Sequence, residues 1–404
     1  MEPAQTRPAT AGHDDAPVVS YVQQLLEQAV ALKASDIHFE PYEHQYRVRM
    51  RIDGELREVA SPHMALKDRL ASRIKVMSRL DIAEKRLPQD GRMKLHLVSG
   101  RELDLRVSTL PTLFGEKLVI RVLDSAQAQL DLGRLGYEPE DLERLLAAIH
   151  APHGLVLVTG PTGSGKTQSL YACLNLLNTP EVNIATVEDP CEIQLTGINQ
   201  VNVQDKPGLS FAVALRAFLR QDPDILMVGE VRDLETANIA IQAAQTGHLV
   251  LSTLHTNDAP ATLVRLRNMG TAPYNIAASV SLITAQRLVR CLCSQCKRSA
   301  SVPAAVWLKA GWLPHLSHED NVPVFEPVGC PQCHKGFVGR TGIFQVMPVS
   351  AKMQQLVLQE AGIQEMARQA RNEGVSSLRM AGLRKVLQGI TSLDEVLAAT
   401  REST

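Results

Sequence analysis

A chain of 404 residues is longer than one average domain, so its length favours two or three domains with a sizeable core. Hydrophobic residues make up 45% of the chain, charged residues 21% and the net charge is −1, which is typical of a soluble globular protein and argues against broad nucleic-acid binding. Because no apolar run reaches the ~18 residues of a membrane span and no signal peptide opens the chain, we expect a cytoplasmic protein.

The first part of the chain predicts a tail followed by a small α+β domain. Residues 1–16 are rich in Pro, Thr, Ala and Asp with almost no large apolar side chains, so we expect them to be disordered. Apolar residues then recur at helical spacing over 18–33, and Asp53-Gly54 is a hairpin turn signal. A second helix is expected over 66–80, and strands over 36–40, 46–52, 55–59, 92–98, 102–110 and 117–123. Together these elements predict a domain over residues 17–124.

One strand of this domain carries a basic face. By the two-residue period of a strand, Met93 and Leu95 share one face, while Arg92, Lys94 and His96 share the other. From composition alone, such a face is expected to be ordinary solvated charge.

A second domain is predicted over residues 132–404, after a polar and aperiodic linker over 125–131. Apolar strands alternate with helices in this part of the chain. The strands are expected over 155–159, 183–188, 224–229 and 248–254, and the helices near residues 167, 210, 233 and 258. Such alternation predicts a mostly parallel sheet whose ligands lie at the carboxyl ends of the strands.

A phosphate-binding loop lies between the first of these strands and the next helix. Its sequence is Gly160-Pro161-Thr162-Gly163-Ser164-Gly165-Lys166-Thr167, which matches G-x-x-x-x-G-K-[ST]. The glycines let backbone N–H groups approach a phosphate chain, and the following helix points its positive end at it. Lys166 is expected to reach the β- and γ-phosphates of a nucleotide such as ATP, and Thr167 to ligate Mg²⁺. The alternative, an ordinary tight turn, is disfavoured by the strand-loop-helix context.

Carboxylates follow two of the predicted strands. The stretch 225–230 has a Walker B pattern in which Gly229 stands where many such proteins have aspartate, so Glu230 is the available carboxylate. The strand at 183–187 ends in Glu188-Asp189. We expect Glu230 to act mainly near the metal and Glu188 to polarise water, although the sequence leaves open which carboxylate orients the attacking water.

Two histidines bracket the fourth strand. His248 precedes the strand 249–254 and His255 follows it, so we expect the sheet edge to carry a sensor of the γ-phosphate. Taken singly, each such residue could be a cap or a loop charge. Their joint placement with the carboxylates at strand ends favours a catalytic edge.

Four of the seven cysteines form two C-x-x-C pairs, at Cys293, Cys296, Cys330 and Cys333. Four thiolates at this spacing suit tetrahedral zinc, which would pin a zinc-binding segment over 291–335. Reduced, unligated thiols are the alternative, and disulfides are disfavoured in the cytoplasm. Cys173, Cys191 and Cys291 lie outside the pairs and are expected to be buried or incidental.

From about Val18 to its C-terminus the chain resembles the GspE/PilB group, the type II secretion and type IV pilus assembly ATPases. The stretches that carry the resemblance are Ala34–His38, the P-loop, Val187–Pro190, Phe218–Asp224, Gly229–Asp233 and Thr246–Asn257. The resemblance implies an α/β fold: a RecA-like P-loop NTPase domain with C-terminal helices, a preceding small α+β (PAS-like) domain and a zinc-binding excursion. It also implies that Glu188 and Asp189 form an aspartate box, Glu230 the Walker B carboxylate, and His248 and His255 a histidine box.

The same resemblance implies a homohexameric ring on the cytoplasmic face of the inner membrane, which turns ATP hydrolysis into movement of a membrane platform protein. Arginines that match the family's phosphate-contacting positions are Arg92, Arg106, Arg121 and Arg340. Ile198–Val201 and Phe218 are more similar to the pilus extension branch than to the secretion branch. Family members of this type usually carry a further N-terminal domain that docks on the platform, whereas about seventeen residues precede the first helix here.

Two other functions are compatible with a P-loop ATPase. A pilus retraction motor shares the P-loop and the histidine box, but the four-cysteine segment is not expected there. A DNA-translocating ATPase could use the cysteine pairs as a nucleic-acid-binding ribbon, but the near-zero net charge counts against it, so no nucleic-acid partner is expected.

Overall fold

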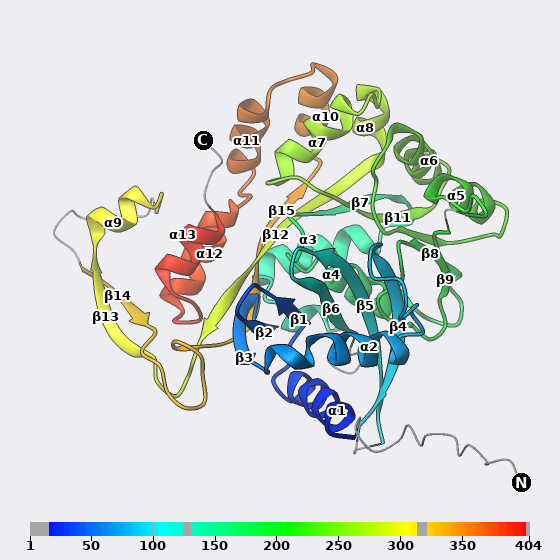
Figure 1. Cartoon of the computed structure of the whole chain (residues 1–404). Helices are drawn as coiled ribbons and strands as arrows, with labels where there is room; N and C mark the ends of the chain where they lie inside the picture. The colour runs from blue at the N-terminus through cyan, green and yellow to red at the C-terminus, as the bar shows by residue number, and fades with distance from the viewer. Residues whose placement is uncertain (1–15, 98–99, 124–130, 205, 313–320, 401–404) are drawn as a thin grey trace, which may run out of the picture. The chain divides into compact units, whose positions relative to one another are not determined.

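The computed structural model describes residues 16–97, 100–123, 131–204, 206–312 and 321–400 (Figure 1). The chain forms two compact units, 1–127 and 128–404. Residues 1–15 of the tail expected to be disordered, and residues 125–130 of the expected linker, lie outside the described residues.

The first unit is a six-stranded antiparallel sheet with two helices. The strand order is β3-β2-β1-β6-β5-β4. The helices are α1 (Ala16–Ala31) and α2 (Lys67–Met77), and the strands are β1 (Asp36–Pro41), β2 (Tyr46–Ile52), β3 (Glu55–Ala60), β4 (Gln89–His96), β5 (Glu102–Thr112) and β6 (Gly115–Leu123). Asp53 and Gly54 both have positive φ, 52° and 89°, as the two-residue turn between β2 and β3 requires. The predicted elements of this part of the chain are therefore confirmed.

The two faces of this sheet differ in chemistry. The apolar face packs with α1 and α2 in one core that includes Ile37, Phe39 and Met50. The opposite face carries charge, and its most buried carboxylate is Glu40, which accepts two 2.8 Å hydrogen bonds from Arg49. Burial by itself would raise the pKa of Glu40, but the hydrogen bonds from Arg49 and Lys117 outweigh it and lower that pKa to about 2.

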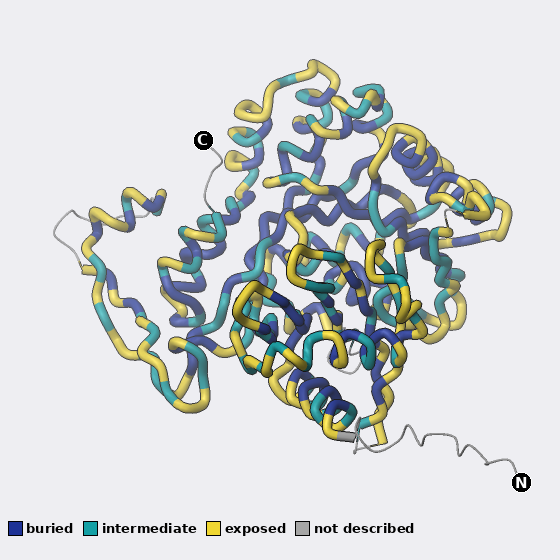
Figure 2. The backbone as a smooth tube through the Cα atoms, in the orientation of Figure 1, coloured by how far each residue is buried: buried dark blue, intermediate teal, exposed yellow. Residues whose placement is uncertain are grey.

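The second unit is built on a seven-stranded sheet in the order β15-β12-β7-β11-β10-β8-β9. Every neighbouring pair is parallel except β12 with β15, which is antiparallel. The strands are β7 (Gly154–Thr159), β8 (Ile184–Glu188), β9 (Asn199–Asn202), β10 (Ile225–Val228), β11 (Leu249–Leu254), β12 (Val280–Leu292) and β15 (Phe337–Pro348). β7, β8, β10 and β11 are buried along their whole length, as expected for parallel strands covered on both faces (Figure 2). The predicted mixed α/β fold with a parallel sheet is confirmed.

Helices cover both faces of this sheet. They are α3 (Pro139–Ile149), α4 (Lys166–Leu177), α5 (Phe211–Phe218), α6 (Leu234–Gln245), α7 (Ala259–Asn268), α8 (Pro273–Ser279), α10 (Ala351–Leu358), α11 (Ile363–Asn372), α12 (Leu378–Leu387) and α13 (Leu393–Ala399). Alternate residues of β7 enter different cores: Val156 packs with α3 and α4, whereas Leu155 packs with α5 to α8 and with α10. Ser210, Asp233 and Asp258 cap α5, α6 and α7 with their side chains, which confirms the predicted helix starts.

A small excursion leaves the sheet between β12 and β15. It consists of β13 (Arg298–Pro303), α9 (Ala304–Lys309) and β14 (Asn321–Glu326), and it lies beside α12 and α13 (Figure 1). It shares a separate core with these helices, in which Trp307 is fully buried next to Leu383 and Val396. Within the described residues, no helix is both long and apolar enough to cross a membrane.

Candidate active site

The loop from Gly160 to Thr167 joins the carboxyl end of β7 to the first turn of α4. Gly160, Gly163 and Gly165 have φ values of 151°, 79° and 88°, a region that favours glycine. A Cβ at Gly160 would lie 2.5 Å from Ser164 Oγ, so a larger residue would push the loop apart. Gly165 is the N-cap of α4 and has no side chain to cap the first N–H groups of the helix, which suits them to an anion.

Lys166 folds back over this loop. Its Nζ donates to the carbonyl oxygens of Gly160 at 2.9 Å and Pro161 at 3.2 Å. Burial lowers the pKa of Lys166, the charge of Arg287 lowers it further, and Glu230 opposes the shift. Thr167 is exposed in the first turn of α4. The Thr167 hydroxyl and the Glu230 carboxylate are both hard oxygen donors, the kind of ligand that Mg²⁺ prefers.

Three of the predicted residues meet at the carboxyl edge of the sheet. Glu230, just past β10, forms an ion pair with Arg232 and lies 3.5 Å from His255 Nε2. Arg232 also reaches Asp189 at 3.3 Å, so it links the two acidic strand ends. Burial lowers the pKa of His255, and the charge of Lys166 lowers it further, whereas Glu230 opposes the shift. The lowered pKa favours a neutral imidazole. Arg232 was not singled out from the sequence, although it lies within the matching stretch Gly229–Asp233.

Glu188 is only 3% exposed and is held on both carboxylate oxygens. Tyr171, on α4, donates to Oε2. Thr186 Oγ1 donates to Oε1 at 2.7 Å, and Gln200 Nε2 does so at 3.2 Å. Burial and the nearby Glu188 charge raise the pKa of Tyr171 above its ordinary value. A water molecule or a metal ion at Glu188 would therefore compete with these three partners. Sequence reasoning missed Tyr171 and Gln200 because no motif names them.

His248 lies at the other edge of the sheet. Because β11 runs parallel to β7, His248 is beside the start of β7, where its carbonyl accepts from Gly154 N at 3.1 Å. Its Nδ1 is 2.9 Å from the carbonyl oxygen of Ala243 at the end of α6. The structure does not bring His248 and His255 together, so the expectation that both mark the phosphate edge is wrong within a single chain.

The arginines predicted in the first unit form a row across three strands. Arg92 on β4 is directly opposite Arg106 on β5, and Arg106 is opposite Arg121 on β6. Arg121 continues the row to Asp36 on β1, to which its Nε donates at 3.2 Å. Like charges placed directly opposite each other are unfavourable in an antiparallel sheet, so an anion that lies over the row would relieve the repulsion.

Arg340 lies near the cysteine segment rather than beside the P-loop. It is exposed on β15, opposite Arg290 of β12. The β12 residue that contacts the P-loop is Gln286, and its partner on β15 is Phe344. Arg290 is itself engaged, because its Nε donates to Glu395 at 3.0 Å.

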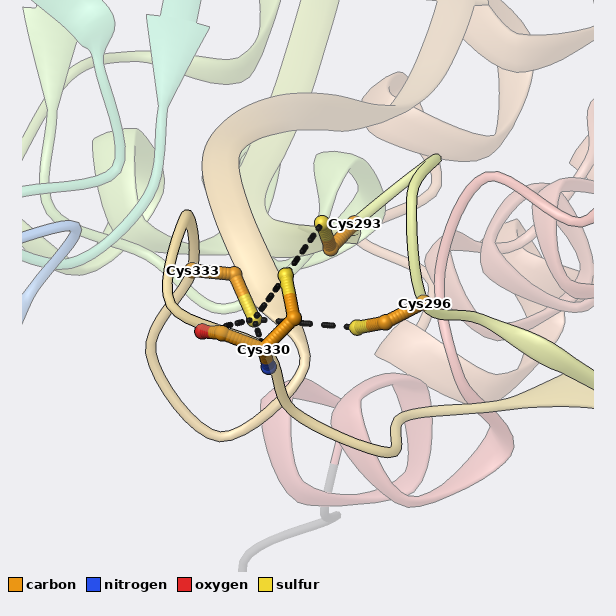
Figure 3. Close-up of side chains that lie close together, drawn as sticks. All are labelled: Cys293, Cys296, Cys330 and Cys333. Carbon is orange, nitrogen blue, oxygen red and sulfur yellow. Dashed lines mark hydrogen bonds between the residues drawn. The ribbon is translucent and has the colours of Figure 1, made fainter.

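The predicted metal ligands do converge. The sulfur atoms of Cys293, Cys296, Cys330 and Cys333 all lie within 4.8 Å of one another and point toward a common centre (Figure 3). The backbone N–H groups of Gly329 and Cys330 donate to the sulfurs of Cys296 and Cys333, at 3.3 and 3.1 Å. Four sulfurs at this separation fit the four ligand positions of a tetrahedral zinc ion and leave none for water.

Comparison with known proteins shows the family of the chain. The sequence profile of the family described as Type II/IV secretion system protein matches residues 11–398. The chain belongs to this family. The type IV pilus assembly ATPase PilB of Acinetobacter baylyi is 56% identical to it over 389 residues, which are 96% of this chain and 67% of that protein. The type II secretion system ATPase E of Vibrio cholerae is 48% identical over 391 residues, which are 96% of this chain and 76% of that protein.

The fold of this secretion-family chain is similar to that of the Legionella pneumophila ATPase DotB, with a TM-score of 0.69 over 94% of this chain and 95% of that chain, at 20% identity. The resemblance to the GspE/PilB ATPases is thus confirmed, and the chain is an ATP-hydrolysing enzyme of the P-loop type. The roles of the individual site residues stay predictions.

Proposed function

We propose that this chain is the ATPase motor of a type IV pilus assembly machine, or of the related type II secretion machine, and works as a homohexamer on the cytoplasmic face of the inner membrane. The observation that carries the proposal is the 56% identity to PilB along 96% of this chain, against 48% for the secretion ATPase. The sequence of Ile198–Val201 supports the pilus branch. The partner is then an inner-membrane platform protein, without nucleic acid.

In fold terms, the second unit is RecA-like and the first is PAS-like. The P-loop strand β7 in the interior of a parallel sheet, with the carboxylate strands β10 and β8 farther along it, supports the RecA-like description. An antiparallel sheet with α1 and α2 on its apolar face supports the PAS-like one.

The chemistry follows from the residues at the sheet edge. The P-loop and Lys166 bind the phosphates of ATP, and Thr167 and Glu230 lie where a magnesium ion would be held. Bound Mg²⁺ would neutralise charge on the phosphates. Glu188 polarises the attacking water once ATP binding has moved one of its present partners, and neutral His255 is placed beside Glu230 to sense the γ-phosphate.

For the arginine row of the first unit we propose a catalytic role. A P-loop site alone hydrolyses ATP slowly, because Lys166 and Mg²⁺ leave part of the charge that develops on the transferred phosphoryl group unstabilised. The guanidinium groups of Arg92, Arg106 and Arg121 approach or leave the nucleotide as one rigid body, because they lie on adjacent strands of one sheet. ATP favours the closed arrangement through its contacts with the row, and closure propagated around the ring is the power stroke. Arg340 lies away from the P-loop on β15, so its predicted phosphate contact is not part of this proposal.

A deletion strain tests the assignment. Cells that lack this chain are scored for surface pili, for secreted proteins and for DNA uptake, and are complemented with the wild type or with Lys166→Ala. We expect surface pili to be lost and to be restored by the wild type alone. Loss of secreted proteins with normal pili would assign the secretion machine instead. Pili that persist because they no longer retract would point to a retraction motor.

We also propose that the four-cysteine cluster holds a structural zinc ion. A closed four-thiolate site leaves no position for water, so the metal is expected to stabilise the excursion and not to act on ATP. Tryptophan fluorescence reports on the excursion, because both tryptophans of the chain, Trp307 and Trp312, lie in it. Their ring centroids are 5.7 Å apart.

Metal analysis of the purified protein is expected to give about one zinc per chain. Cys330→Ser is expected to lower the thermal stability and to change tryptophan fluorescence, because the segment that follows β14 loses its anchor. Cys191→Ser, which removes a thiol outside the cluster, is the matched control. A metal-free wild type of full stability would count against the zinc site.

A further inference from the structure

Two consecutive polar residues of β12, Gln286 and Arg287, lie near the P-loop, and neither belongs to a motif recognised in the sequence. Ala285 of β12 is in register with Thr159, the last residue of β7, so Gln286 and Arg287 come next to the start of the loop. The Gln286 amide is buried and clamps the loop. Its Nε2 donates to the carbonyl oxygen of Ser164 at 2.7 Å, and its Oε1 accepts from Ser169 at 2.8 Å. Gln286 thereby fixes the P-loop to the first turns of α4.

Arg287 points to the opposite side of β12 from Gln286. Its Nη1 donates to the carbonyl oxygen of Gln286 at 2.9 Å, and its Nη2 donates to the carbonyl oxygen of Asn257 at 2.9 Å. That Gln286 oxygen lies only 2.6 Å from where a Cβ would stand on Gly160. Lys166 Nζ binds the carbonyl oxygen of the same glycine at 2.9 Å. Two cationic side chains therefore lie near Gly160: Lys166 binds its carbonyl oxygen, and Arg287 binds the Gln286 oxygen that approaches it.

The charges around Arg287 favour the binding of an anion. Among the described residues, no carboxylate lies within ion-pair distance of its guanidinium, and Asp258 acts on it only at longer range. Arg287 is half-buried, and both of its hydrogen-bonded neighbours are neutral acceptors. Two like charges close together in a partly desolvated site repel each other, and a polyanion between them turns that repulsion into attraction.

We propose that Arg287 is a second phosphate-binding cation of this site, supplied by the same chain as the P-loop, and that its guanidinium contacts phosphate oxygens of the bound nucleotide opposite Lys166. The inference rests on the proposed function only in that a nucleotide binds at the P-loop. It also gives Arg287 a second effect. Asn257 lies two residues after His255. A guanidinium that exchanges its bond to Asn257 for a bond to a phosphate oxygen would therefore change the contacts of the segment around His255 when nucleotide binds.

The test uses the full chain with Mg²⁺ and compares Arg287→Gln and Arg287→Lys with the wild type. Affinities for ATP and ADP are measured by calorimetry, and the melting temperature without nucleotide is recorded for each variant. A charge-assisted hydrogen bond to phosphate is worth ~10- to 100-fold in affinity, so Arg287→Gln is expected to bind both nucleotides that much more weakly. Arg287→Lys keeps the charge and is expected to recover most of the affinity. Arg298→Gln, which removes an exposed charge on β13, is the control and should bind like the wild type.

Two results would overturn the proposal. One is an unchanged nucleotide affinity in Arg287→Gln. The other is an Arg287→Lys variant that binds nucleotide as weakly as Arg287→Gln. That result would mean that the hydrogen bonds to Asn257 and Gln286 matter and the positive charge does not. The Lys comparison also decides the case if Arg287→Gln melts early. A wild-type chain that bound neither ATP nor ADP would instead refute nucleotide binding at the P-loop, independently of Arg287.

Discussion

Replacement of Arg106 by alanine is expected to lower the rate of ATP hydrolysis by ~10³-fold or more while ATP binding stays close to that of the wild type. Arg106 is the middle member of the arginine row, opposite Arg92 on one side and Arg121 on the other. A cation that meets the phosphoryl group only in the transition state lowers the barrier without adding to ground-state affinity. The measurement is steady-state phosphate release at saturating ATP, paired with calorimetric ATP affinity.

Lys94→Ala is a suitable control for Arg106→Ala. Lys94 lies two residues from Arg92 on the same exposed face, but its Nζ already donates to Glu102 at 2.6 Å. Its loss is expected to leave hydrolysis unchanged. An Arg106→Ala variant that hydrolysed ATP like the wild type would mean that the row is ordinary solvated charge, as composition alone suggested.

The second large effect is expected at the sheet edge, where Lys166→Ala should impair ATP binding and Glu188→Gln should impair turnover. Lys166→Ala removes the cation that faces the phosphates and should weaken ATP binding. Glu188→Gln keeps the shape of a buried side chain that contacts Tyr171 and Gln200, so binding should persist while kcat falls by ~10²- to 10⁴-fold, the usual worth of a positioned proton acceptor.

Glu181→Gln provides the matched control for the carboxylate, because Glu181 is exposed shortly before β8. It should bind and hydrolyse ATP like the wild type. Normal steady-state hydrolysis in Lys166→Ala or Glu188→Gln would remove that residue from the mechanism. If Glu188→Gln kept full turnover and Glu230→Gln lost it, the water-orienting role would pass to Glu230.

Local signals predicted much of the fold. The helix starts at Ser210, Asp233 and Asp258 could be found because a side chain there caps the first turn, a contact within three residues. The parallel strands could be found because both their faces are buried, which leaves a continuous apolar run. The P-loop and the cysteine pairs were found because their chemistry requires particular residue types at fixed spacing.

The remaining features depend on which distant segments become neighbours. Gln286 touches the P-loop only because β12 lies beside β7, and Tyr171 touches Glu188 only because α4 packs on the sheet that contains β8. Neither adjacency follows from local periodicity. The position of His248 was predictable, however. Parallel strands bring their carboxyl ends to one edge, so a residue that precedes β11 belongs to the opposite edge from one that follows it.

We expect hydrolysis to need both units: the P-loop of the second and the arginine row of the first. The most direct measurement compares the full chain with a fragment of residues 132–404, at equal concentration, for ATP binding and for the rate of phosphate release. The fragment is expected to bind ATP with similar affinity but to hydrolyse it at least ~10³-fold more slowly, because it lacks the row. A fragment that hydrolysed ATP as fast as the full chain would contradict this expectation.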